Sequence, residues 1–237
     1  MCGIIGIQNN SEAAMLAYMG LYAQQHRGQE GAGVVSSDGV NLHRHMGQGL
    51  VSDVFSESNV FDALIGDAAI GHVRYSTTGD SDNKNVGPLT FNMGDHYLSI
   101  AHNGNLVNIE DIRKQLQKEG ALFQTSTDTE IIIHLIAHEK GKNLAEKVGK
   151  AVQKIEGAFS LLLLSPNEII AVRDPHGIRP FCMGKLKDTI VFASETCALD
   201  LLGAEYLRDV KPGEMIVAND DGFYSNTISE ARTSKHC

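Results

Sequence analysis

The stretch CGIIGIQ (residues 2–8) follows Met1 directly, and the reading of the whole fold starts from it. Its small and apolar residues predict a buried β-strand. The stretch also begins with a thiol, which becomes N-terminal if Met1 is removed. A free α-amino group has an ordinary pKa of roughly 7.7–8.0, so it can exchange protons with the thiol of the same residue. Cys2 would then be a nucleophile that carries its own base, although a cysteine that merely begins a buried strand gives the same pattern.

Beyond this strand, hydrophobic periodicity predicts a helix over residues 11–25. Ser11 is its expected N-cap. Three large side chains fall on one face of this helix: Met15, Met19 and Tyr22. Short strands separated by Gly and Asp turns are expected between about residues 31 and 102.

Three further helices are predicted where a capping residue precedes an apolar run. Asn108 precedes the first of them. Thr127 and Glu130 form a capping box before the second, and Asn143 with Glu146 begins the third. The last third of the chain returns to strands, and its final segment leads into a hairpin turn. These segments are AFSLLLL (158–164), EIIAVRD (168–174), TIVFASE (189–195), EMIVAN (214–219) and the turn NDDG (219–222).

This order of elements decides the expected fold class. Strands followed by helices and then by strands argue against a regular βαβ alternation. They favour an α+β fold in which antiparallel sheets are covered by helices. Two sheets stacked between helical layers would use these elements well, and the uniform character of the sequence favours one domain.

Composition narrows the class of protein. With 42% hydrophobic and 21% charged residues, the chain is an ordinary globular protein. It has neither the run of about 18 apolar residues that spans a membrane nor a signal-peptide layout, so we expect a cytoplasmic protein without a membrane partner. The net charge of −9 and the scattered Lys and Arg argue against a nucleic-acid partner. The four cysteines include no CxxC pair, and Cys182 and Cys197 are expected in the core.

Two strand-like segments carry residues suited to amide chemistry. GHVRYST contains Arg74, whose guanidinium can bind a carboxylate through two parallel hydrogen bonds. AHNGNL contains Asn103 and Gly104. Their side-chain amide and backbone N–H are two donors suited to one developing oxyanion, although a plain turn gives the same NGN pattern.

Asp128 complements Arg74 in charge. It could accept the ammonium group of an amino acid, or it could only favour the first turn of its helix. Together Arg74 and Asp128 have the charges needed to hold a free amino-acid zwitterion. His134 and His138 lie four residues apart, but Ile replaces the glutamate of the HExxH zinc motif, so no metal is expected there.

Eight segments together resemble the class II glutamine amidotransferases and keep the order of that family. They are MCGIIGI (1–7), QHRGQEGAG (25–33), GHVRYSTTG (71–79), AHNGNL (101–106), TSTDTE (125–130), RDPHGIRP (173–180), FASETCAL (192–199) and KPGE (211–214). The resemblance runs along nearly the whole chain. RDPHGIRP and the ending SKHC are most similar to the glutaminase domains of amidophosphoribosyltransferases, which open purine biosynthesis.

The resemblance implies a fold, a reaction and a set of residues. The fold is that of an N-terminal-nucleophile hydrolase, a four-layer αββα sandwich. The reaction is hydrolysis of glutamine to glutamate and ammonia through a thioester on Cys2. Asn103 and Gly104 would form the oxyanion hole. The residues implied for binding glutamine are Arg74, Asp128, Thr77, Arg27 and Gly28.

The resemblance also implies a longer enzyme. Residues 1–230 match the amidotransferase domain, and residues 231–237 would begin the connection to a phosphoribosyltransferase domain that is missing here. The full-length enzyme is expected to be a homo-oligomer that uses Mg²⁺ and, in some members, a [4Fe–4S] cluster with Cys237 as one ligand. One terminal cysteine cannot hold a four-thiolate cluster, so no cofactor is expected in this chain.

Three other functions stay open on the sequence. The chain could be a stand-alone hydrolase of another amide, or a subunit that supplies ammonia to a separate synthase chain. It could also be a catalytically inactive module that only binds glutamine. The presence of the complete set of expected site residues weighs against the inactive module.

Overall fold

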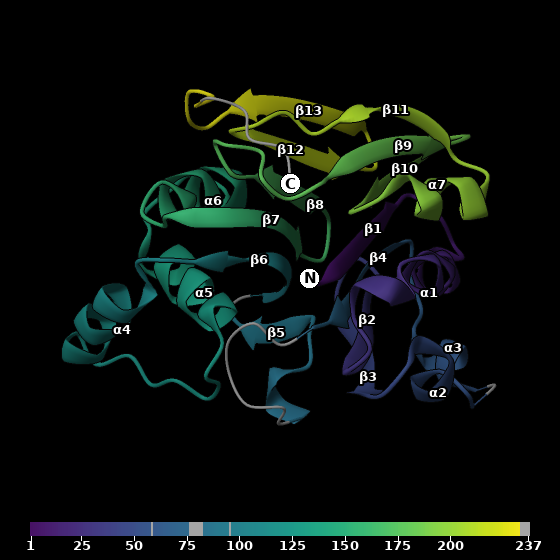
Figure 1. Ribbon diagram of the computed structural model, residues 1–237, viewed down its shortest axis with the longest axis horizontal. Coiled ribbons are helices and arrows are strands. Elements are labelled where there is room, and N and C mark those ends of the chain that lie inside the picture. Colours follow the sequence, from purple (N-terminus) through teal and green to yellow (C-terminus); the bar gives the residue numbers. More distant parts are fainter. Residues whose placement is uncertain (58, 76–82, 95, 233–237) are drawn as a thin grey trace.

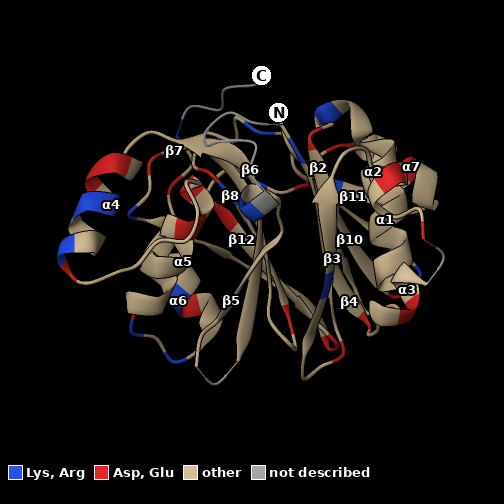
Figure 2. Ribbon diagram, turned by 90° about the horizontal axis from the view of Figure 1, so that it is seen from below, with Lys and Arg blue, Asp and Glu red and all other residues tan. Residues whose placement is uncertain are grey.

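The computed structural model describes residues 1–57, 59–75, 83–94 and 96–232. Within them, two antiparallel β-sheets lie face to face between two layers of helices (Figures 1 and 2). The α+β class and the four-layer αββα sandwich expected from the sequence are therefore confirmed.

The first sheet contains the N-terminal strand at its centre. In the described part of the chain it has seven strands in the order β11-β9-β10-β1-β4-β2-β3. Their bounds are β1 (Gly3–Gln8), β2 (Gly31–Ser37), β3 (Leu42–Gln48), β4 (Ala68–Arg74), β9 (Cys182–Leu186), β10 (Thr189–Ala193) and β11 (Glu205–Asp209).

The second sheet is built mostly from the later half of the chain. Among the described residues it has six strands in the order β13-β12-β8-β7-β6-β5. Their bounds are β5 (Leu89–Asn92), β6 (Tyr97–Leu106), β7 (Gly157–Leu164), β8 (Ile169–Arg173), β12 (Glu214–Asn219) and β13 (Gly222–Thr227). The hairpin predicted at NDDG is confirmed, because Asn219 pairs with Gly222 at the turn between β12 and β13.

Helices cover the outer face of each sheet, as Figure 2 shows from below. Those beside the first sheet are α1 (Ala13–Ala23), α2 (Val51–Val54), α3 (Val60–Ala63) and α7 (Thr196–Leu202). Those beside the second are α4 (Ile109–Lys118), α5 (Asp128–His138) and α6 (Leu144–Val152). Two single-turn 3₁₀ helices, η1 (Gln25–Arg27) and η2 (Asn83–Asn85), lie in connecting segments. No helix in the described residues is long and apolar enough to cross a bilayer.

The strand predicted at the N-terminus is confirmed, and its unbroken apolar sequence follows from its central place. Ile5 and Ile7 belong to the core between the first sheet and its helices. Ile4 belongs to the core between the two sheets, with Ile70 and Phe192. Because β1 is covered on both faces, it needs apolar side chains at successive positions rather than alternate ones.

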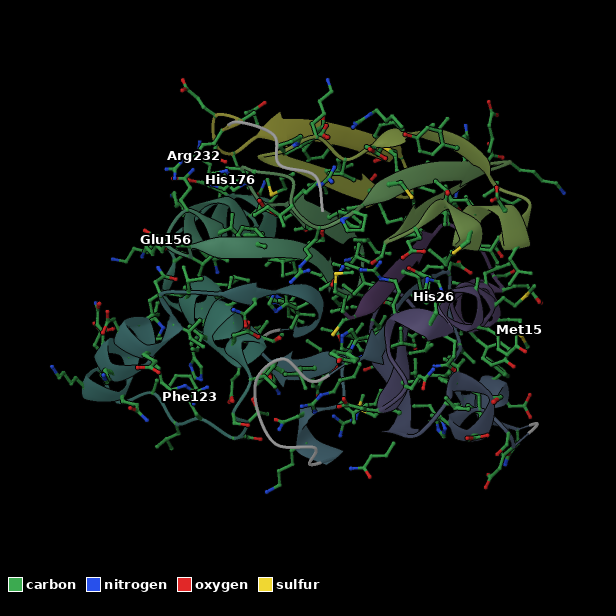
Figure 3. All side chains as sticks on the ribbon, viewed as in Figure 1. Met15, His26, Phe123, Glu156, His176 and Arg232 are labelled. Atoms are coloured by element: carbon green, nitrogen blue, oxygen red, sulfur yellow. The ribbon has the colours of Figure 1, made fainter. Side chains whose placement is uncertain are left out.

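Helix α1 forms as predicted, but its N-cap residue and the side chains on its buried face are not the expected ones. The expected N-cap is wrong, because Glu12 holds that position and the side chain of Asn10 accepts the Glu12 N–H at 2.9 Å. Met15 lies on the outer side (Figure 3), and Tyr22 is 56% exposed. The buried face consists instead of small residues and one leucine: Ala13, Ala14, Ala17, Gly20 and Leu21.

The three later helices begin where predicted, after Asn108, Thr127 and Asn143, but only Asn143 makes a side-chain cap hydrogen bond. Asn143 caps α6 by accepting the Glu146 N–H at 2.9 Å. At α5, Thr127 is the N-cap residue but makes no side-chain cap bond. Glu130 reaches further back and accepts the N–H groups of Gln124 and Thr125, so the predicted capping box is wrong. The Glu130 carboxylate is satisfied by the loop that precedes the helix.

The close packing of the buried face of α1 leaves no room for a side chain at Gly20, and this can be tested. Alanine normally favours a helix interior over glycine by about 1 kcal/mol. A Cβ at position 20 would lie 1.8 Å from Ile5 Cδ1, so Gly20→Ala should instead reduce the free energy of unfolding by about 1–3 kcal/mol. Urea unfolding of the wild type and of Gly20→Ala measures this difference in the free energy of unfolding.

Gly149→Ala in α6 is the matched control. Its Cβ would meet Ile228 Cγ2 at an ordinary 3.6 Å, so stability should stay equal or rise by up to about 1 kcal/mol. Equal effects of the two substitutions would contradict the close packing of α1 on β1.

Candidate active site

Cys2 lies one residue before β1 and is half-buried. The N-terminus is marked in the middle of the view in Figure 1 and at one edge of the molecule in Figure 2. β1 and β4 are antiparallel with Gly3 opposite Val73, so the start of β1 meets the end of β4. Cys2 Sγ consequently lies 3.5 Å from both the backbone N and the backbone O of Tyr75. The sulfur can therefore accept the Tyr75 N–H and donate its own proton to the Tyr75 carbonyl.

Arg27 fixes the main chain of Cys2. It is the last residue of η1, and its Nε donates to the Cys2 carbonyl oxygen at 2.8 Å. Its Nη1 forms an ion pair with Glu195. The Asn103 amide, oriented to satisfy its neighbours, accepts from Arg27 Nη2 at 3.3 Å and donates to the Cys2 carbonyl at 3.0 Å. All three nitrogens of this buried guanidinium are thus engaged, as a buried charge requires.

Gly28 brings the same segment against the end of β4. A Cβ at position 28 would lie 2.5 Å from the carbonyl carbon and oxygen of Arg74, so the backbones approach too closely for any side chain. Arg27 and Gly28, both named from the sequence, therefore border Cys2 and Arg74 respectively.

Asn103 and Gly104 lie inside β6, paired with Ser160 and Phe159 of β7, so the alternative reading of NGN as a turn is wrong. Leu106 donates its backbone N–H to Asp128 Oδ2 at 3.3 Å. Residues two apart in a strand point their N–H groups to the same side. The Gly104 N–H therefore points toward the cavity that Gly104 lines.

A small cavity of about 40 Å³ beside Cys2 collects residues from both sheets and from the start of α5. Arg74 ends β4 and Asp128 begins α5, so they bring opposite charges to it from separate layers. Arg74 is 5% exposed and Asp128 7%. The other lining residues are His72, Tyr75, Asn85, His102, Gly104, Thr127 and Thr129.

Two buried histidines in this cavity were missed by the sequence analysis. His102 Nδ1 is 3.2 Å from Asp128 Oδ1 and 3.3 Å from Thr129 Oγ1. Burial disfavours the charged imidazolium, but the Asp128 carboxylate outweighs it and raises the pKa of His102. Burial also opposes ionisation of Asp128, yet His102 holds the Asp128 pKa below its ordinary value. Burial, aided by His102 and Arg74, lowers the pKa of His72 to about 3.

A sequence signal for both histidines existed. His72 is two residues before Arg74 in β4, hence on the same face of the strand, and His102 precedes Asn103. Glu195 was also missed, because its contact with Arg27 spans 168 residues.

Other residues named from the sequence lie elsewhere. Thr77 and Cys237 fall outside the described residues. Cys182 is buried as expected, and burial raises its thiol pKa to about 12. Cys197 is only half-buried, because it stands at the start of α7. Within the described ranges, no group of three or more His, Cys, Asp or Glu side chains could hold a metal ion.

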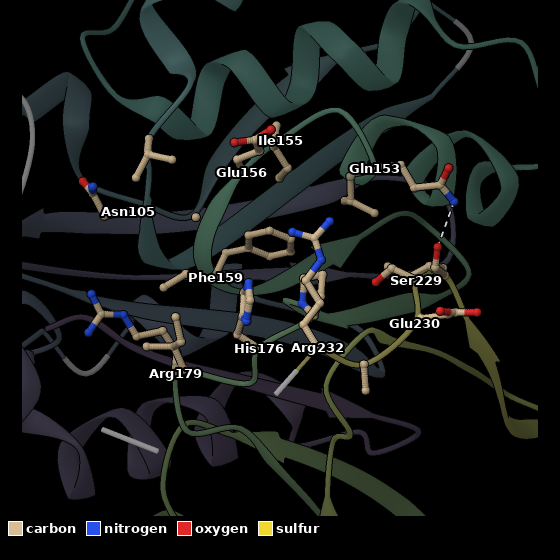
Figure 4. Close-up of a pocket in the computed structure, with 18 residues that line it drawn as sticks. Asn105, Gln153, Ile155, Glu156, Phe159, His176, Arg179, Ser229, Glu230 and Arg232 are labelled. Carbon is tan, nitrogen blue, oxygen red and sulfur yellow. Dashed lines mark hydrogen bonds between the residues drawn. The ribbon is translucent and has the colours of Figure 1, made fainter. Parts of the chain in front are cut away.

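A larger cavity, about 820 Å³, lies between the end of α6, β7 and the segment after β13. Phe159, His176 and Arg232 are among its lining residues (Figure 4). It contains no cysteine, and Cys2 is not part of its wall. The thiol, the opposite charges of Arg74 and Asp128 and the two buried histidines instead line the smaller cavity.

Comparison with known proteins identifies the family of this chain. A family model described as "Glutamine amidotransferase domain" matches residues 72–201. Amidophosphoribosyltransferase from Bacillus subtilis (strain 168) is 44% identical over 229 residues, covering 96% of this chain and 48% of the relative. The chloroplastic amidophosphoribosyltransferase 2 of Arabidopsis thaliana is 48% identical over 239 residues, covering 100% of this chain and 42% of the relative.

A solved structure is similarly close. Glutamine phosphoribosylpyrophosphate (PRPP) amidotransferase from B. subtilis, complexed with ADP and GMP, aligns with a TM-score of 0.95 at 43% identity. The alignment covers 100% of this chain and 51% of that chain. The chain thus spans about half the length of the relatives it matches.

The opposite pKa shifts of His72 and His102 can be tested by NMR titration of the imidazoles. His102 should remain protonated above its ordinary pKa of 6.5, whereas His72 should stay neutral down to about pH 3. The His102–Asp128 pair stabilises the fold fully between about pH 4 and 6.5. That contribution disappears as pH rises through the raised His102 pKa or falls through the lowered Asp128 pKa.

Asp128→Asn should move the His102 pKa below its ordinary value, because burial then acts without the carboxylate. Thr129→Val removes only the hydroxyl contact and should leave the His102 pKa raised. An unchanged His102 pKa in Asp128→Asn would refute the assigned cause.

Proposed function

The chain belongs to the glutamine amidotransferase family, and we propose that it hydrolyses the side-chain amide of glutamine with Cys2 as the nucleophile. The observation that carries the proposal is the cavity at Cys2, where a thiol meets one buried cation and one buried anion. These are the groups needed to attack an amide and to hold the two charged ends of an amino acid. An inactive binding module would not require the thiol.

Substrate binding is proposed to use the two charges. Arg74 can grip the α-carboxylate of glutamine through two parallel hydrogen bonds. Asp128 can accept the α-ammonium group, because it lines the cavity and its pKa is held below the ordinary value, so that it carries a negative charge. The contact with His102 holds the Asp128 pKa below its ordinary value, so Asp128 is ionised at neutral pH. Thr77 remains a proposed binding residue from the family resemblance alone.

The chemistry begins with proton transfer from the Cys2 thiol to the α-amino group that Met1 removal leaves on Cys2. Burial lowers the pKa of the Met1 α-amino group, and the nearby charges of Arg27 and Arg179 add to this shift. An amine on Cys2 would occupy similar surroundings, which favour its neutral, proton-accepting form.

The thiolate then attacks the amide carbon of glutamine. The resulting oxyanion would be held by the Gly104 N–H and by the second amide N–H of Asn103. Collapse of the tetrahedral intermediate breaks the C–N bond, and the α-ammonium group of Cys2 gives its proton to the departing nitrogen, which leaves as ammonia. Water then attacks the glutamyl thioester, which releases glutamate and regenerates the thiol.

The cavity must widen for this reaction. A volume of about 40 Å³ holds only a few water molecules, since one water needs about 10–15 Å³ of such space. The amide chain of glutamine has to displace them. We therefore propose that substrate binding is coupled to opening of the site beside Tyr75.

The wider role is proposed from the relatives named above. Their amidophosphoribosyltransferase activity would use the ammonia to displace pyrophosphate from phosphoribosyl pyrophosphate, as the first step of purine biosynthesis. This chain would be the glutaminase half of such an enzyme. The alternative of an ammonia-supplying subunit for a separate synthase chain places the same glutaminase chemistry at Cys2.

The proposal is tested by assaying glutamate and ammonia release. Cys2→Ala and Cys2→Ser should each lower kcat by at least about a thousandfold, because serine ionises far less readily than cysteine. A protein that retains Met1 should be equally inactive while its circular dichroism spectrum is unchanged.

Cys197→Ser is the matched control, since Cys197 is also a half-buried thiol but lies on α7. It should keep kcat within about twofold. Full activity in a protein with a verified Met1 would exclude the α-amino group as the base, and full activity of Cys2→Ala would exclude the whole proposal.

A further inference from the structure

Glu195 lies just after the β10 strand of the first sheet and is connected to Cys2 through Arg27. It follows β10 and stands at the N-cap position of α7. One carboxylate oxygen forms an ion pair with Arg27 Nη1, and the other lies 2.9 Å from His26 Nε2. The Arg27 side chain is 4% exposed and that of Glu195 is 32% exposed, so the pair is largely shielded on the arginine side.

The segment that carries Glu195 is held in register with the nucleophile strand. Ser194 donates its backbone N–H to the Ile4 carbonyl at 3.0 Å, and the Ile4 N–H donates to Ser194 Oγ at 3.0 Å. Gln24 Oε1 also accepts the Ser194 N–H at 3.1 Å. The residue before Glu195 is therefore attached to Ile4, which is two residues along the chain from Cys2.

Arg27 links the Glu195 carboxylate to Cys2. A guanidinium is planar, so its hydrogen bonds have fixed relative directions. Once Glu195 holds Nη1, the directions of Nε toward the Cys2 carbonyl and of Nη2 toward Asn103 are set. Without the carboxylate, the buried guanidinium would keep its charge but lose its neutralising partner.

We infer that Glu195 is a positioning residue for glutamine hydrolysis. It acts through Arg27 to hold the Cys2 carbonyl, and hence the Cys2 thiol and amine, in the geometry of attack. This inference rests on the proposed function. His26 contacts the same carboxylate but its side chain is 59% exposed, and the described contacts do not connect it to Cys2 except through Glu195.

The first test is the kinetics of Glu195→Gln, which removes the charge and keeps the shape. It should lower kcat about tenfold and leave KM within about twofold, because the Arg74 and Asp128 contacts to substrate are untouched. In an Arg27→Gln background, Glu195→Gln should cause no further loss of kcat. His26→Asn, the matched control, should keep kcat within about twofold.

The second test does not depend on activity. NMR hydrogen exchange follows the Arg27 Nε proton, which donates to the Cys2 carbonyl. It should exchange several-fold faster in Glu195→Gln than in the wild type and in His26→Asn. The unfolding midpoint of Glu195→Gln reports any general loss of fold.

The two tests separate this inference from the proposed function. An inactive wild type would overturn the function, while the exchange rates would still decide the Arg27 contact. Unchanged exchange in Glu195→Gln would overturn the inference, as would fully additive losses with Arg27→Gln. An equal loss of kcat in His26→Asn would also overturn it, because the effect would then not belong to the Arg27 link.

Discussion

The hydrogen bond from the buried Arg27 guanidinium to the Cys2 carbonyl attaches the proposed nucleophile to the interior of the fold. A residue at a chain terminus has few constraints of its own, whereas a nucleophile must be held within a fraction of an ångström. Arg27 supplies this constraint together with Asn103, which reaches the same carbonyl from the second sheet. The cost of burying the guanidinium is offset by its partners, and Glu195 supplies the compensating charge.

The layered architecture determines what can meet at Cys2. β1 is central in the first sheet, β4 ends beside it at Arg74, and β6 contributes Asn103 and Gly104 from the second sheet. The N-terminus of α5 adds Asp128. Opposite charges thus reach the cavity on rigid elements from different layers, as the proposed binding of a zwitterion requires. The contact with the buried His102 holds the Asp128 pKa below its ordinary value.

The sequence predicted features that depend on local pattern. β1 was recognisable because burial on both faces demands an unbroken apolar run, and the cap of α6 because Asn143 and Glu146 are three residues apart. The packed face of α1 was not predictable, since the close approach of Gly20 to Ile5 is a tertiary contact. Short strands such as β9 and β11 carry charged residues, so their sequences lack the apolar pattern of a strand. They are stabilised by pairing with neighbouring strands. Cys2, Arg74 and Asp128 were named by residue type, whereas the links through Glu195 and His102 required the fold.

The central claim is that the Cys2 thiol forms a covalent bond to glutamine. Its most direct test is acid quenching of the protein during turnover, followed by mass spectrometry of the peptides that contain each cysteine. The account predicts one glutamyl group on the peptide that begins with Cys2, released by neutral hydroxylamine as a thioester should be. Cys182 and Cys197 should be unmodified. A glutamyl group on another cysteine, or undiminished turnover after the Cys2 thiol has been alkylated, would contradict the account.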